Sequence, residues 1–321
     1  KHLNKKFIVS IIKQLTTKVL EELALESYKN IIFLDLCSTY IEEINTILKD
    51  KNIFVIDHHQ IKEDKLNGIL IHPNLYDIDG SSEVSSSGLT YLFCKSIYPE
   101  IKQYSYLAIV GAIGDIQEHK GFSGLNNLIL EDCKENIEIK QGLRIFGAQS
   151  KSLFKALEYS TSIFIPGITG NEQAAIGFLS SLGIKLKDEN GKFRKLTDLN
   201  KDEMHKLVTG IIIKRSAEKN PEDIIGNLYL LKNEPDDSAL KDLREFSTLL
   251  NCCGRLHKPS LGIGVCLNDS NSKEQALELL TEYRFEIVKS LNWFYDNKDS
   301  FAKGKDYFIL NAGKNIRDTF I

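Results

Sequence analysis

The sequence predicts an α/β protein whose first part is a parallel, doubly wound sheet. Two apolar runs, 31–36 and 52–57, lack the alternation of apolar and polar residues that is typical of a strand with one solvent-exposed face. A helical pattern at 39–49 lies between them. Apolar strands joined by an amphipathic helix are typical of a parallel sheet with helices on both faces. A third, shorter strand is predicted at 68–72.

Helices are expected around this sheet. Thr16 or Thr17 suits the cap of a helix at 17–27, and the serine run before 87–97 supplies hydroxyls that suit the cap of another. Two more helices are predicted at 103–113 and 124–134.

The organisation predicts three parts: a core at 1–135, a helical and mixed connector at 136–299, and the start of a second α/β domain at 300–321. Apolar periodicity predicts the elements that follow the core. They are helices near 151–159, 171–182, 200–216, 238–253 and 272–297, strands at 226–231 and within 301–313, and a buried strand or helix start at 261–267.

Composition limits the possible functions. The chain of 321 residues carries 41 Lys and Arg against 44 Asp and Glu, a net charge of −3. This balance excludes nucleic-acid binding through a general cationic surface, so a polyanion would be held locally or by a metal. No apolar run reaches the roughly 18 residues of a membrane span. The six cysteines lack metal-finger spacing and indicate reduced thiols in a cytoplasmic protein.

Acidic and imidazole side chains follow the predicted strands. Asp57, His58 and His59 end one strand, Asp35 ends its neighbour, and Asp115 closes an apolar run with small residues. Neighbouring strands lie about 4.8 Å apart and ligands bind at their carboxyl ends, so these side chains can converge on one ion. Carboxylate and imidazole without thiolate suit Mn²⁺ or Mg²⁺. Each residue alone is as readily a turn, cap or surface residue, and it is their ordered occurrence that favours a site.

The order Asp35, Asp57-His58-His59, SSSG at 85–88 and GAIGD at 111–115 resembles the DHH phosphoesterase superfamily, which is named for the Asp-His-His tripeptide. The resemblance implies two divalent ions, usually Mn²⁺, that hydrolyse a phosphodiester. It implies that Asp35 bridges the ions, that His58 and Asp115 bind them, and that Asp57 orients or ligates. It implies that Asp57 and His59 are catalytic, with His59 at the phosphate.

The segment LLNCCGRLHKPS at 249–260, with the long helix after it, resembles the RecJ-type single-strand nucleases. Within them, FIPGITG at 164–170 and NAGKNIRDTFI at 311–321 resemble the archaeal RecJ-like or GINS-associated nucleases. The resemblance implies a set of substrate-binding residues in addition to His59: Ser86, Ser87, Asn251, Arg255 and Lys258. We interpret Cys252 and Cys253 as packing residues.

The superfamily's first motif, an HxDxDG-like sequence that supplies further aspartate ligands, has no match in this chain. Residues 7–9 resemble the family's second strand, so we expect the sequence to be cut at both ends. We also expect weak binding of the metal pair and little nuclease activity.

The leading functional prediction is a two-metal exonuclease that acts on single-stranded DNA or RNA in DNA repair and replication. One alternative is an oligoribonuclease or a phosphodiesterase of small nucleotides or cyclic dinucleotides. The other is an inactive scaffold that docks on replisome (GINS-like) proteins. No membrane partner is expected.

Overall fold

The computed structural model describes residues 5–62, 65–119, 121–160, 163–317 and 320. The chain divides into two compact units, Lys1–Asn136 and Ile137–Ile321. Each unit is described by itself. Within the predicted domain at 300–321, residues 318, 319 and 321 lie outside the described residues.

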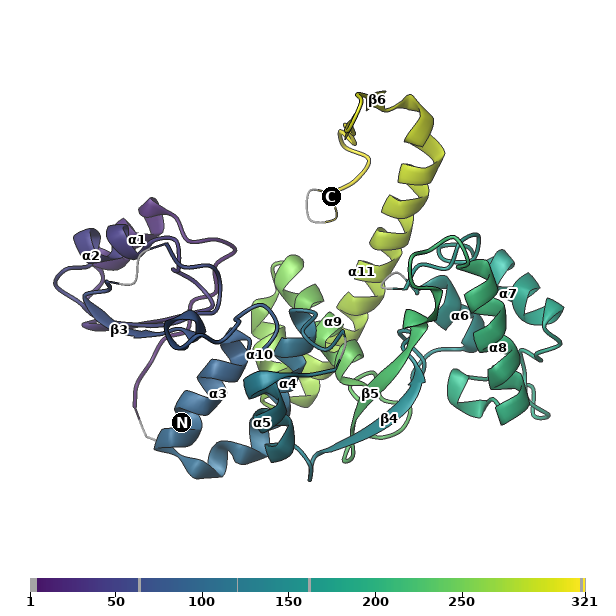
Figure 1. Ribbon diagram of the computed structural model, residues 1–321, viewed down its shortest axis with the longest axis horizontal. Helices are drawn as coiled ribbons and strands as arrows, with labels where there is room; N and C mark the ends of the chain where they lie inside the picture. The colour runs from purple at the N-terminus through teal and green to yellow at the C-terminus, as the bar shows by residue number, and fades with distance from the viewer. Residues whose placement is uncertain (1–4, 63–64, 120, 161–162, 318–319, 321) are drawn as a thin grey trace. The chain divides into compact units, whose positions relative to one another are not determined.

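A three-stranded parallel sheet organises the first unit, in the order β1 (Asn30–Leu34), β2 (Asn52–Ile56) and β3 (Gly68–Ile71) (Figure 1). Leu34 pairs with Ile56, and Ile56 pairs with Ile71. The predicted parallel sheet is confirmed, and all three strands end at the same edge.

Helices α1 (Thr17–Leu25) and α2 (Ile41–Ile47) cover one face of this sheet. The Thr16 side chain caps α1 by accepting a hydrogen bond from the Val19 amide. Leu20 and Ile44 pack with strand residues that share one side of the pleat, such as Phe33. This cluster is the apolar core of the sheet.

The opposite face is partly covered. Ile56 packs there with Leu89 of α3 (Ser86–Ile97), whereas Ile32, Leu34 and Ile69 stay 58%, 46% and 51% exposed. Helices therefore pack on both faces of the sheet, as predicted for a doubly wound sheet. The second face is covered less completely, because apolar side chains around β1 remain exposed there.

Helices α4 (Ser105–Gly114) and α5 (Gly124–Asp132) complete the first unit. The Tyr91 hydroxyl of α3 donates to the Asp132 carboxylate at the end of α5, 2.9 Å away. Gly111 of α4 lies against Ser87 of α3, so a small residue allows the close helix packing beneath the strand ends that the sequence suggests.

Enlarging Gly111 is expected to separate α3 from α4. An added Cβ would lie 2.1 Å from Ser87 Oγ, so Gly111→Ala should lower the free energy of unfolding by about 1–3 kcal/mol through overpacking. Among the described residues, nothing outside the backbone of its own helix and its chain neighbours lies within 4 Å of a Cβ added at Gly177, in α7 of the second unit. Gly177→Ala should therefore raise stability by about 0.5–1 kcal/mol. Urea denaturation of both variants measures this contrast, and a shift of the same sign in both would contradict it.

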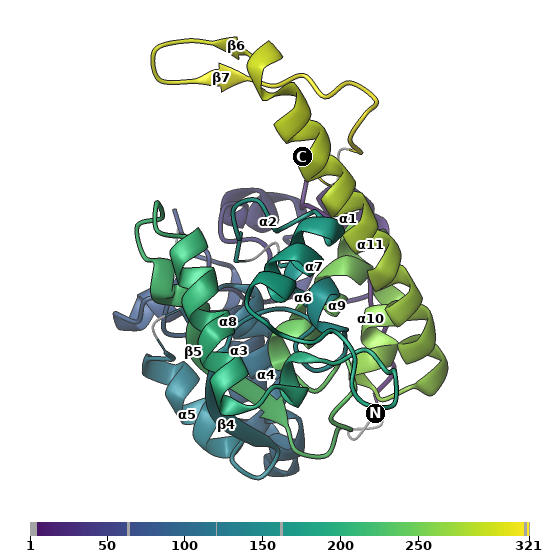
Figure 2. The ribbon, with the colours of Figure 1, turned by 90° about the vertical axis from the view of Figure 1, so that its right-hand side faces the viewer.

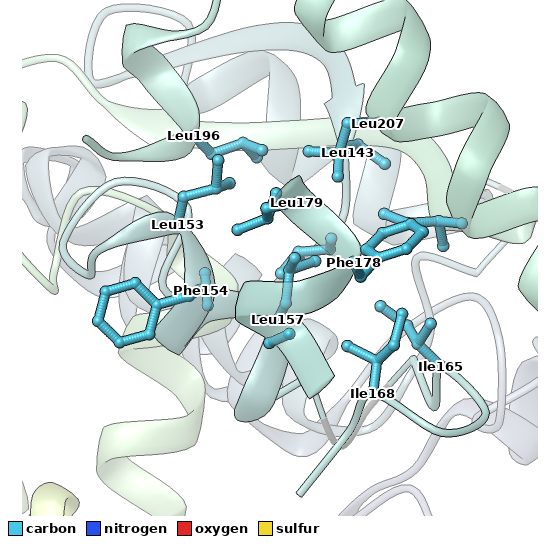
Figure 3. Close-up of a cluster of buried hydrophobic side chains, with 14 of the residues drawn as sticks. Leu143, Leu153, Phe154, Leu157, Ile165, Ile168, Phe178, Leu179, Leu196 and Leu207 are labelled. Carbon is cyan, nitrogen blue, oxygen red and sulfur yellow. The ribbon is translucent and has the colours of Figure 1, made fainter. Parts of the chain in front are cut away.

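The second unit begins with an antiparallel pair, β4 (Ile137–Leu143) and β5 (Ile225–Leu231). Helices α6 (Leu153–Glu158), α7 (Glu172–Ser181) and α8 (Lys201–Lys214) follow β4 in the chain. Their apolar side chains form one buried cluster, shown in Figure 3, to which Leu143 of β4 also contributes.

The rest of the second unit contains α9 (Leu243–Arg255), α10 (Pro259–Cys266), the long α11 (Ser270–Asn297) and an antiparallel pair, β6 (Ala302–Lys303) and β7 (Phe308–Ile309). Figure 2 shows β6 and β7 beyond the C-terminal end of α11. Among the described residues, no helix combines the length and apolar character needed to cross a bilayer.

Three predictions of local structure need correction. The strand β4 is absent from the prediction because only Ile137, Ile139 and Leu143 of its seven residues are large and apolar. Helix α9 begins at Leu243 rather than at 238, since Asp242 caps it by accepting from the Arg244 amide. Residues 7–9 form no strand, because nothing in the described part of the chain pairs with them.

Candidate metal centre

The edge where β1 and β2 end presents the acidic and imidazole residues that the sequence predicts. Asp35 follows β1, and its amide donates to the Ile56 carbonyl over 2.9 Å, so the strand pairing continues to this residue. Its backbone is left-handed, with φ of 61°. Non-glycine residues adopt this conformation rarely, and such strain gathers at functional sites.

His58 lies at the centre of the cluster. Its Nδ1 is 2.7 Å from the Gly80 carbonyl oxygen, and because a carbonyl only accepts, Nδ1 carries the proton. Its Nε2 is 3.5 Å from Asp35 Oδ1 and 3.6 Å from Asp115 Oδ2. In the neutral ring the Nε2 lone pair therefore faces two carboxylates, which is the arrangement of a metal-ligating histidine.

Asp115 reaches the cluster from the C-terminal end of α4. Burial raises the pKa of its carboxyl above the usual value, and the negative charge of Asp35 adds to this shift, which a protonated His58 would oppose. Two carboxylates that disfavour each other's charge are suited to a cation between them. Ile116, directly after it, also has left-handed backbone, with φ of 60°.

Asp57 is buried beneath the cluster, 1% exposed. Its Oδ2 accepts hydrogen bonds from the Ser38 amide and hydroxyl at 2.9 and 2.6 Å, and its Oδ1 lies 2.8 Å from His59 Nδ1. Burial would raise the pKa of Asp57, but the hydrogen bonds from Ser38 and His59 outweigh it and lower the pKa. In this geometry Asp57 orients the neighbouring groups; its predicted catalytic and ligand roles stay predictions.

His59 is held from two sides. Its Nδ1 lies 2.8 Å from Asp57 and 3.8 Å from Asp35 Oδ1, and the buried His72 donates from Nε2 to its carbonyl oxygen over 2.7 Å. Burial would lower the pKa of His59, but the hydrogen bond to Asp57 and the nearby carboxylates raise it overall. The His59 side chain is 58% exposed, so it is accessible to a substrate.

The predicted serines lie in the same cavity as two of the carboxylates. A cavity of about 480 Å³ is lined by Asp35, Asp115, Ser86 and Ser87 together with residues of α3 and α4. Ser87 Oγ donates to the Ala108 carbonyl, whereas Ser86 Oγ is buried without a hydrogen-bond partner among the described residues. The structure thus brings both serines to the cluster, and their substrate role stays a prediction.

The remaining predicted residues belong to the second unit. Asn251 and Arg255 lie on the exposed side of α9, where Arg255 Nε donates to Asn251 Oδ1 over 3.3 Å. Lys258 is exposed at the start of α10. Cys252 and Cys253 are fully buried, which is compatible with packing. The substrate role of the three polar residues stays a prediction.

Sequence reasoning overlooked the residues whose hydrogen bonds support the cluster: Ser38, His72 and Gly80. His72 directly follows β3, and that position at a third strand end is a signal that was available. The others lie in loops, and only their hydrogen bonds reveal their role.

The donor set fits a divalent cation. Asp35, His58 and His59 each offer a ligand atom, and these atoms lie within 4.8 Å of one another. Carboxylate oxygen and imidazole nitrogen without thiolate suit Mn²⁺ or Mg²⁺ better than structural Zn²⁺. Among the described residues, two carboxylates, Asp35 and Asp115, face His58 Nε2, so a second ion would need further ligands. The number of ions stays a prediction.

Comparison with known proteins finds related sequences. Residues 145–228 match the family model of the DHH-CID domain. An uncharacterized protein of Methanocaldococcus jannaschii is 32% identical over 297 residues, which are 90% of this chain and 63% of that protein. The chain therefore spans less than two thirds of the length of this relative.

Comparison with solved structures finds a shared fold. The crystal structure of CDC45 from Entamoeba histolytica matches with a TM-score of 0.62 and 10% identity, over 87% of this chain and 62% of that one. Exonuclease RecJ bound to manganese matches with a TM-score of 0.47 and 13% identity, over 88% and 54% of the two chains. RecJ from Thermus thermophilus in complex with Mn²⁺ matches with 0.46 and 12%, over 88% and 32%. At these identities the CDC45 match establishes the fold alone.

Proposed function

Because this chain has the fold of the DHH superfamily and carries a DHH-CID domain at residues 145–228, we propose that it is a metal-dependent phosphodiesterase of the RecJ-like type. Its substrate would be single-stranded DNA or RNA. The observation that carries the proposal is the orientation of His58, whose Nε2 faces Asp35 and Asp115.

The residues of the site would have two roles, metal binding and contact with the phosphate. Asp35, His58 and Asp115 would hold Mn²⁺, and the exposed ring of His59, fixed by Asp57, would contact the phosphate. A bound divalent ion supplies positive charge to a phosphoryl oxygen and lowers the pKa of a water molecule. This local positive charge reconciles a net charge of −3 with a polyanionic substrate.

Residues of the second unit would bind the backbone of the single-stranded nucleic acid. Arg255, paired with Asn251 on the exposed side of α9, offers a planar guanidinium suited to a backbone phosphate, and Lys258 adds a second cation. The same proposal includes exonuclease action, two bound ions, Mn²⁺ as the physiological ion, GINS-like replisome partners and a cytoplasmic location.

Digestion of a labelled single-stranded 30-mer tests the proposal. We expect slow, Mn²⁺-dependent shortening of the 30-mer, no digestion of a duplex, and loss of activity in His58→Ala. A dinucleotide as the preferred substrate would instead support a small-substrate phosphodiesterase. Digestion that persists in His58→Ala, or that continues in excess chelator, would contradict the proposed site.

A scaffold is the second candidate function, because among the described residues only the carboxylates of Asp35 and Asp115 lie within 4 Å of His58 Nε2. A replisome scaffold needs the fold but no hydrolysis. Absence of digestion at every Mn²⁺ concentration, together with a stable fold, would support this function over the enzyme.

A further inference from the structure

A buried chain of hydrogen bonds continues from His58 away from the metal cluster. The Gly80 carbonyl oxygen accepts from His58 Nδ1 at 2.7 Å and from Gln117 Nε2 at 3.0 Å. Gln117 Oε1 in turn accepts from Asn126 Nδ2 at 2.7 Å. This series of hydrogen bonds therefore links Asn126 of α5, through Gln117 in the loop after α4, to the Gly80 carbonyl that orients His58.

Chemistry determines which atoms donate and which accept in this series of hydrogen bonds. Gln117 Nε2 also lies 3.3 Å from the Val84 carbonyl oxygen, and since both of its neighbours are carbonyl oxygens, the amide nitrogen must point toward them. Its oxygen then accepts from Asn126. Gln117 is 5% exposed and Asn126 is fully buried, so water does not replace these partners at low cost.

Gly80 is itself closely packed against His58. A Cβ at Gly80 would lie 2.3 Å from the His58 carbonyl oxygen, so the two backbones touch where a side chain cannot fit. The acceptor of His58 Nδ1 is thus fixed by backbone contact on one side and by Gln117 on the other.

We propose that Gln117 and Asn126 are positioning residues that hold the Gly80 carbonyl, and through it set the tautomer and orientation of His58. Fixing Nδ1 as the protonated nitrogen leaves Nε2 free to face Asp35 and Asp115. Partners of this kind, one step removed from a ligand, commonly affect metal affinity by about 10–100-fold. The expected effect on metal binding rests on the proposed function. The expected effect on the orientation of His58 does not, because it concerns the protein without metal.

Long-range ¹⁵N–¹H NMR of the metal-free chain tests the orientation directly. The wild-type His58 ring is expected to show one tautomer with the proton on Nδ1. In Gln117→Met, which keeps the length of the side chain but cannot donate, both tautomers should be populated. Asn45→Leu is the control, because Asn45 likewise bridges backbone groups of one loop, at Lys65 and Asn67, without a link to His58.

Isothermal titration with Mn²⁺ gives the second readout. Gln117→Met should bind Mn²⁺ about tenfold more weakly, at the lower end of the usual range because it acts through Gly80, while Asn45→Leu should bind as the wild type does. Asn126→Ser, which removes the partner of Gln117 and leaves Gln117 in place, should show the same changes to a smaller extent. It serves as the test if Gln117→Met does not fold.

The outcomes are distinguishable. A folded Gln117→Met or Asn126→Ser with an unchanged His58 spectrum overturns the positioning role. No Mn²⁺ binding by the wild type would contradict the proposed metal site, and the NMR spectra would still decide whether Gln117 positions His58. Weaker Mn²⁺ binding with an unchanged His58 spectrum would also overturn the inference, because the effect would then not act through the ring.

Discussion

Asp35→Asn is expected to weaken Mn²⁺ binding by more than about 100-fold, beyond the loss usual for a supporting residue. Asparagine has nearly the same size and also tolerates left-handed backbone, so φ of 61° at this position should be kept. The change removes one negative charge 3.5 Å from His58 Nε2. Binding of a divalent cation depends on such charges, whereas the fold around β1 does not.

Mn²⁺ binding measured by electron paramagnetic resonance checks this expectation, with thermal unfolding as a check on the fold. Asp50→Asn provides the matched control. Asp50 is exposed and lies before β2, at the opposite end of that strand from the cluster. Equal Mn²⁺ affinity of the two variants would show that Asp35 is not a ligand.

Glu245→Gln is expected to stabilise the chain by about 3 kcal/mol at pH 8 and by less than about 1 kcal/mol at pH 5. Glu245 of α9 is fully buried. Its carboxylate accepts from the Gly147 amide at 2.8 Å and from the Ser150 hydroxyl at 2.9 Å. Glutamine keeps both contacts, because the serine hydroxyl can accept instead of donate.

The pH dependence follows from the pKa of Glu245. Burial, with the charge of Asp242, raises this pKa from 4.5 to about 7, against the opposing effects of Ser150, Arg284 and Gly147. Between these two values the folded state binds the proton and the unfolded state does not. Stability therefore falls as the pH rises through this range, and the cost of ionising Glu245 is complete above pH 7.

Urea denaturation of wild type and Glu245→Gln at pH 5 and pH 8 measures the difference, which isolates Glu245 from other titrating groups. Glu189→Gln, an equal change of charge at an exposed loop position, should show no difference between the two pH values. If the wild type gained stability relative to Glu245→Gln as the pH rose, the buried carboxylate would be stabilising when charged, and the prediction would be wrong.

Much of the fold was predictable because its elements are local. The apolar runs at β1 and β2, the helical spacing of α2 and the serine cap of α3 each encode one element in consecutive residues. β4 and the late start of α9 were not predictable in the same way. The pairing of β4 with β5 joins residues about 90 positions apart, as for Ile137 with Leu231, and only that partner makes a short, charged stretch into a strand.

Local patterns in the sequence are enough to predict which residues meet at the cluster, because Asp35, His58 and Asp115 each lie just after an element that such a pattern predicts. How these residues are held depends on contacts between distant parts of the first unit. The contact of Gln117 with Gly80 spans 37 positions and that of Asp57 with Ser38 spans 19, and no periodicity encodes such hydrogen bonds. They form only after the strands and helices pack, since buried polar groups then find partners among whatever the fold brings near.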